Sequence, residues 1–91
     1  IRDDLPIKEW VYGIVIDGRA LAIPRKSLPD VMPVRINLSG TELLVRWDNE
    51  AENIAVTEVA SGEPFPVGIW SFWFSWQAFY PNTAIWNPNA P

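Results

Sequence analysis

The sequence predicts a small α+β domain, in which a curled antiparallel sheet of about four to six short strands carries one aromatic C-terminal helix. Three observations predict this class. Short stretches rich in β-branched and aromatic residues are bounded by turn residues, two pairs of stretches are joined by turn dipeptides, and the aromatic segment 69–80 has helical spacing. At 91 residues and 48% hydrophobic composition, the chain is expected to form a single domain, 1–91, with a small core.

The first hairpin is predicted by its turn. Residues 10–16 have the composition of a strand, and residues 19–23 return before Pro24. Asp17-Gly18 between them is a dipeptide that accepts positive φ at both centres of a tight turn. The polar residues 1–9 before it are expected to be an entry arm.

A second hairpin is predicted after a connector at 25–33. Residues 34–38 alternate apolar and polar side chains, Ser39-Gly40 turns the chain, and residues 41–48 return with Leu43, Val45 and Trp47 on one face. An acidic loop at 48–53, another strand at 54–59 and a turn at 61–64 follow. These segments supply the rest of the expected sheet.

The aromatic segment 69–80 is predicted to be a helix about 18 Å long. On a helical wheel of about 100° per residue, one face carries the residues expected to pack on the sheet: Ile69, Phe72, Trp73, Trp76, Phe79 and Tyr80. Pro81 is expected to end the helix. Residues 84–86 are expected to add a short strand, and residues 87–91 a loose tail.

The candidate site consists of the residues that this wheel leaves off the core face. Trp70 and Phe74 project about 100–140° around the wheel, so either neighbouring loops such as residues 63–67 cover them or a partner does. Ser71 and Ser75, with Ala78, form a stripe of small residues on which another backbone could pack, or a plain helix surface. The partner-binding hypothesis therefore rests on Trp70, Phe74, Ser71 and Ser75.

Composition limits the chemistry. The chain has no Cys and no His, which excludes thiolate and imidazole catalysis and disulfides within it. A net charge of -4 with seven scattered Lys and Arg argues against a nucleic-acid partner. No apolar run is long enough to span a bilayer. The chain begins at Ile1 rather than Met, and we expect it to be a processed product or a fragment.

Carboxylates are the remaining candidates for catalysis or metal binding. Asp48, Glu50 and Glu52 alternate as in a calcium loop, but the glycine and the distal Glu of such a loop are missing, so a solvated turn is expected. Asp3-Asp4, or Glu42 with Glu63, could be imagined as a glycoside-hydrolysing pair, but nothing selects two acids among eleven. No catalytic, metal or cofactor residue is predicted.

Two stretches resemble a known family, the prokaryotic domain-of-unknown-function family 3179. Residues 11–24, VYGIVIDGRALAIP, are similar to its V-x-G-V-x-x-x-G-E-A-R-A-Y-P pattern, and residues 73–83, WFSWQAFYPNT, to its W-x-x-W-x-x-x-[HY]-P-x-T. The matches cover under a third of the chain. Ile23 stands where the family has Tyr. The family's His, Glu and Asn are replaced by Val31, Met32 and Arg35, and its Cys-containing motif is absent. The resemblance implies a scaffold without the family's polar groups and an extracytoplasmic location, whether periplasmic, secreted or membrane-anchored.

The function predicted from these observations is a non-catalytic structural or protein-interaction domain, part of a larger chain or assembly. Its partner would be a protein or a second copy. The alternative is a carbohydrate-binding module that uses Trp rings as a stacking platform, with Trp86-Asn87 and Trp47 as candidates. An enzyme is not predicted, because carboxylates are the only general bases that the composition offers.

Overall fold

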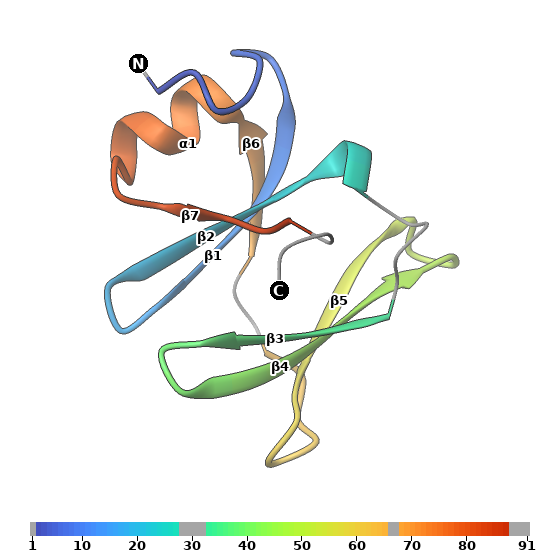
Figure 1. The fold of residues 1–91 in the computed structure, drawn as a ribbon. Coiled ribbons are helices and arrows are strands. Elements are labelled where there is room, and N and C mark those ends of the chain that lie inside the picture. The colour runs from blue at the N-terminus through green and yellow to red at the C-terminus, as the bar shows by residue number, and fades with distance from the viewer. Residues whose placement is uncertain (1, 28–32, 66–67, 88–91) are drawn as a thin grey trace. The chain divides into compact units, whose positions relative to one another are not determined.

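A computed structural model describes residues 2–27, 33–65 and 68–87, and it confirms the α+β class (Figure 1). The described residues form seven strands in two sheets, together with one α-helix and one 3-10 helix, η1 (Arg25–Ser27). The chain divides into two compact units, Ile1–Ser27 with Val67–Pro91, and Leu28–Pro66. Part of the expected connector, 28–32, and the tail from residue 88 lie outside the described residues.

The first hairpin is confirmed. β1 (Trp10–Ile16) and β2 (Arg19–Pro24) are antiparallel, with Ile16 opposite Arg19. Asp17 and Gly18 have φ of 50° and 76°, the positive values that this tight turn requires. The local turn chemistry therefore sets the register of the pair.

Two shorter strands extend this hairpin into a four-stranded sheet with the order β6-β1-β2-β7. β6 (Ile69–Phe72) pairs antiparallel with β1, and β7 (Ala84–Ile85) pairs parallel with β2. The helix α1 (Trp73–Phe79) begins directly after β6, as Figure 1 shows, and the segment that follows it leads into β7. β6 and α1 therefore meet at a sharp corner of the chain.

The helix predicted over 69–80 is wrong for its first four residues, which form β6. Trp70 lies opposite Tyr12 and Phe72 opposite Trp10, so this segment completes a ladder with β1. Aromatic residues favour such a pleated surface, and cross-strand pairing adds to that preference. The helix does end before Pro81, as expected, with Tyr80 as its C-cap residue.

The predicted core face of this segment is also partly wrong. Trp73 and Trp76 are buried, with 0% and 4% of their surface exposed. Ile69, Phe79 and Tyr80 are exposed instead. For Ile69 the change follows from the later helix start, because a strand residue and a helix residue do not share one wheel. Phe79 and Tyr80 are the last helical residue and the C-cap residue.

The core of this unit lies between α1 and one face of the sheet. Its buried members are Val11, Ala20, Ala22, Trp73 and Trp76. Gly13 completes this face, and the Trp76 ring lies where a side chain at Gly13 would be. The Trp76 indole Nε1 donates a hydrogen bond to Thr83 Oγ1 at 3.0 Å, which fixes the ring.

The N-terminal arm is a structural part of this unit rather than only an entry segment. Because Phe72, the N-cap residue, makes no side-chain cap, the first helical amides need other acceptors. Trp73 N donates to Glu9 O at 2.8 Å, and Phe74 N donates to Ile7 O at 3.1 Å. Arg2 extends the contact, since its carbonyl accepts from Trp73 Nε1 at 3.1 Å and its guanidinium lies 5.3 Å from the Trp73 ring centroid. The arm thus caps the helix and covers its buried tryptophan.

Arg2 also sets the titration of Asp4. Its Nε and Nη2 donate to the carboxylate at 2.8 Å and 3.1 Å, and these hydrogen bonds hold the pKa of Asp4 below its ordinary value. The interaction therefore stabilises the fold above the ordinary carboxyl pKa and is lost as pH falls through the lowered value. We expect Arg2→Gln to raise the pKa of Asp4, measured by carboxyl ¹³C NMR, while Arg35→Gln leaves it unchanged. An Asp4 pKa that is the same in both variants would contradict this account.

The second unit is a three-stranded antiparallel sheet in the order β3-β4-β5, and it confirms the second hairpin. Its strands are β3 (Val34–Leu38), β4 (Thr41–Asp48) and β5 (Asn53–Glu58). The turn residues Ser39 and Gly40 have φ of 53° and 82°. Leu43 and Val45 are buried as predicted. The turn expected at 61–64 lies earlier, at residues 59–61, where Gly62 N donates to Glu58 O at 2.9 Å.

Candidate functional site

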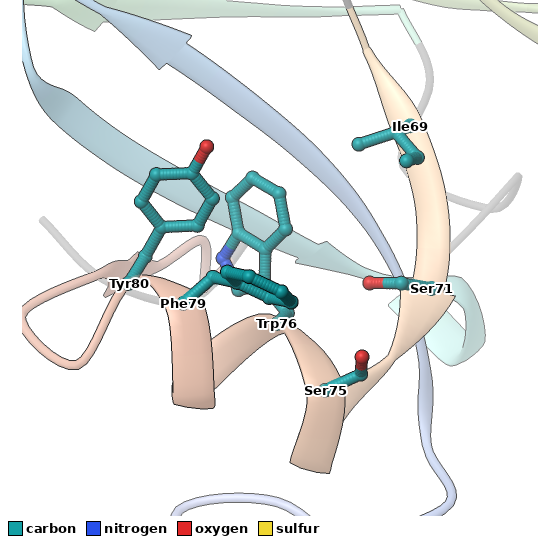
Figure 2. Close-up of a pocket in the computed structure, with 6 residues that line it drawn as sticks. All are labelled: Ile69, Ser71, Ser75, Trp76, Phe79 and Tyr80. Carbon is teal, nitrogen blue, oxygen red and sulfur yellow. The ribbon is translucent and has the colours of Figure 1, made fainter.

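A groove lies between β6 and α1 in the first unit (Figure 2). Its volume is about 200 Å³, and its lining residues are Ile69, Ser71, Ser75, Trp76, Phe79 and Tyr80. A cavity of about 150 Å³ is enough to hold a benzene molecule, so the groove can accept a single aromatic ring. We call it the β6–α1 groove.

The corner between strand and helix builds this groove. In β6 the side chains alternate, so Ile69 and Ser71 face the helix while Trp70 and Phe72 face the other side. Figure 2 shows the Ser71 and Ser75 hydroxyls directed into the space between strand and helix. Trp76 forms the inner wall, with its ring 4.5 Å from that of Tyr80.

The groove is neutral, and one of its polar atoms lacks a partner. Neither β6 nor α1 contains a charged residue. Ser71 Oγ is buried and has no hydrogen-bond partner among the described residues. A buried hydroxyl left unpaired costs about 1–3 kcal/mol. The groove therefore favours an uncharged occupant, because burying a charge here would leave it unpaired.

Phe79 stands at the rim of the groove and is its most exposed side chain. It exposes 78% of its surface, and Ile69 on the strand side exposes 59%. The sequence assigned both to the core, because the wheel began at residue 69. A wheel that starts at Trp73 would have found Phe79, since it lies about 120° from Trp73 and outside the buried stripe.

The predicted site residues divide between two places. Ser71 and Ser75 line the β6–α1 groove. Trp70 lies on the other face of β6 with its ring centroid 5.2 Å from that of Tyr12, and Phe74 lies on α1 with 44% of its surface exposed. The expectation that Trp70 and Phe74 share one side of a helix is wrong, because Trp70 belongs to a strand.

A second exposed aromatic feature was not predicted. Trp10 exposes 46% of its surface, and its ring centroid lies 4.2 Å from that of Phe72. The ring centroid of Phe72 lies 6.1 Å from that of Phe74. The sequence placed Trp10 only as the first residue of the first predicted strand. The signal that could have found this row is the pairing of Trp10 with Phe72, which becomes visible only once β6 is recognised as a strand.

Asp48 and Glu42, two of the acids singled out from the sequence, serve local structure. Asp48 Oδ1 accepts from the amides of Glu50 and Ala51 at 3.0 Å and 3.2 Å, which is the geometry of an Asx turn. Glu42 pairs with Arg35 at 3.4 Å. Within 2–27, 33–65 and 68–87, no group of three or more acidic side chains could hold a metal ion.

Comparison of the chain with protein-family models, curated protein sequences and solved structures gives no significant match. The resemblance to family 3179 therefore remains a hypothesis. The residues of its second motif do form one connected group, in which Trp76 contacts Tyr80 and bonds Thr83, and Thr83 N donates to Tyr80 O at 3.0 Å. No helix in the described part of the chain is long and apolar enough to cross a membrane.

Proposed function

We propose that this chain is a non-catalytic protein-interaction domain whose contact surface is the β6–α1 groove with Phe79 at its rim. The observation that carries the proposal is the 78% exposure of Phe79 beside an apolar, uncharged groove. Large aromatic side chains exposed next to a pocket are typical of contact sites. In the wider proposal the domain is part of a larger chain or assembly, and it acts outside the cytoplasm, as the family resemblance implies.

The energy available from Phe79 is useful but modest. At about 25 cal/mol per Å² and 150–250 Å² for an aromatic side chain, covering its exposed part would contribute roughly 3–5 kcal/mol. Association also costs translational freedom and side-chain entropy. One ring alone therefore does not give tight binding, and the partner must also fill the groove.

A carbohydrate platform fits the exposed rings less well. Sugars stack on the open faces of aromatic rings, but Phe72 and Phe74 are stacked on each other at an interplanar angle of 18°. Trp10 covers Phe72 at a ring-centroid distance of 4.2 Å. The rings proposed from sequence, Trp47 and Trp86, belong to different units and are only partly exposed. The protein-interaction proposal is therefore the one that the geometry favours.

Titration with toluene tests whether the groove accepts an apolar ring. In ¹H–¹⁵N NMR spectra we expect saturable shifts of the Ser71 and Ser75 amides and of the Trp76 indole. Ser75→Leu fills the groove and should abolish these shifts, while Phe74→Ala, on the same helix but outside the groove, should preserve them. If toluene leaves the Ser71, Ser75 and Trp76 signals unmoved in the wild type, the groove is not a contact surface and the proposal fails.

A further inference from the structure

The β6–α1 groove and Phe79 are complementary features on one surface of the unit. The groove is large enough for one aromatic ring, and Phe79 is an aromatic ring that projects beside it. In a twofold dimer the same surface of both copies forms the interface. If one residue of the first copy contacts a second residue of its partner, then that second residue of the first copy also contacts the first residue of the partner. The β6–α1 groove, with the Phe79 ring at its rim, can form such a reciprocal contact.

Charge supports the pairing of two identical surfaces. The chain as a whole carries a net charge of -4, so most pairs of like surfaces would repel. β6 and α1 carry no charged side chain, which makes this surface a neutral area on an acidic chain. Two copies can therefore bring these two elements together without placing like charges of β6 or α1 opposite each other.

We propose that the partner of the groove is a second copy of this chain, with Phe79 of each copy inserted into the β6–α1 groove of the other. This inference rests on the proposed function and names its partner. Reciprocal insertion buries both exposed rings.

The available area makes this dimer weak. Phe79 and Ile69 have the two largest exposed fractions among the large apolar side chains of the described residues. Together they supply on the order of 200–300 Å² per copy, against the roughly 800 Å² per partner of a stable complex. We therefore expect a dissociation constant between about 0.1 and 1 mM.

Sedimentation equilibrium at protein concentrations up to about 1 mM measures this association. We expect the wild type to form dimers and Phe79→Ala to weaken the dimer at least about tenfold, because an anchor ring is lost from each groove. Phe74→Ala is the matched control, since it removes an exposed Phe from the same helix and should change the dissociation constant less than about twofold. A wild type that stays monomeric throughout this range overturns the inference.

A mixing experiment tests the reciprocal geometry itself. Phe79→Ala removes the ring, which is also one wall of its own groove, but leaves the other lining residues in place. Ser75→Leu keeps the ring but fills the groove. Each variant alone should be monomeric. Their mixture should associate more weakly than the wild type but measurably more than either variant alone, followed by ¹H–¹⁵N NMR shifts at about 1 mM, because one insertion remains possible. If the mixture associates no more than either variant alone, Phe79 does not enter the groove. Circular dichroism checks that Ser75→Leu folds, and Ser75→Met is the second variant if it does not.

The two proposals fail in different ways. If toluene binds the groove but the wild type stays monomeric, the groove accepts a side chain of another protein and the dimer is wrong. If the wild type dimerises but the mixture gives no heterodimer, the copies meet through another surface, and the row of Trp10, Phe72 and Phe74 becomes the surface to vary.

Discussion

Gly13→Ala is expected to lower the free energy of unfolding by about 2–3 kcal/mol. A Cβ atom at Gly13 would overlap the six-membered ring of Trp76. That ring is only 4% exposed and is fixed by the hydrogen bond to Thr83, so it has little room to move. Overpacking of this kind forces side chains off their rotamers or shifts the backbone, and both changes destabilise the native state.

Urea denaturation, followed by tryptophan fluorescence, measures this effect. The control is the same substitution in a Trp76→Phe background, where the smaller ring gives space to a new methyl group. Because the two positions are in contact, their effects should not add, and Gly13→Ala should cost much less there than in the wild type. Equal costs in both backgrounds would show that the clash with Trp76 is not the cause.

The sequence could predict the hairpins because their determinants are local. Asp17-Gly18 and Ser39-Gly40 adopt positive φ in the structure, and these dipeptides are recognisable without any tertiary information. Each turn then fixes the pairing of the strands on either side. Local chemistry and the final fold agree at these positions.

The aromatic segment was harder to predict because its structure depends on a distant partner. β6 is a strand because β1 offers it a free side for pairing, and the Trp10–Phe72 and Tyr12–Trp70 pairs join residues far apart in the chain. A helical wheel contains no information about such pairs. Trp73 and Trp76 were nevertheless assigned correctly to the core, because their spacing lies within the true helix.

The candidate site was predicted only in part for the same reason. Ser71 and Ser75 were identified as a stripe on one helix, yet they face each other from a strand and a helix across the groove. Phe79 was missed because the early helix start placed Phe72, a strand residue, almost beside it on the wheel, and this widened the apparent apolar face. Small errors in an element's boundary thus change which side chains are expected to be exposed.

Trp73→Ala is expected to lower the free energy of unfolding by about 3–5 kcal/mol, the usual range for removing a buried tryptophan. The side chain is fully buried, and its indole Nε1 donates to Arg2 O at 3.1 Å. Its loss therefore leaves a cavity against the sheet and removes one of the contacts that hold the N-terminal arm. For a domain of this size each kcal/mol shifts the melting temperature by about 4–8 °C, so we expect a fall of more than about 12 °C.

Phe79→Ala is the matched comparison, because the sequence assigned Trp73 and Phe79 to the same buried face. With 78% of its surface exposed, Phe79 makes few contacts within its own chain. Its removal should change the melting temperature by less than about 4 °C, at a protein concentration low enough to keep the chain monomeric. A large and equal loss in both variants would mean that Phe79 belongs to the core, and it would then have no ring to offer a partner. If Trp73→Ala lowers the melting temperature much more than Phe79→Ala does, Phe79 is a projecting aromatic side chain that the fold of one copy does not require.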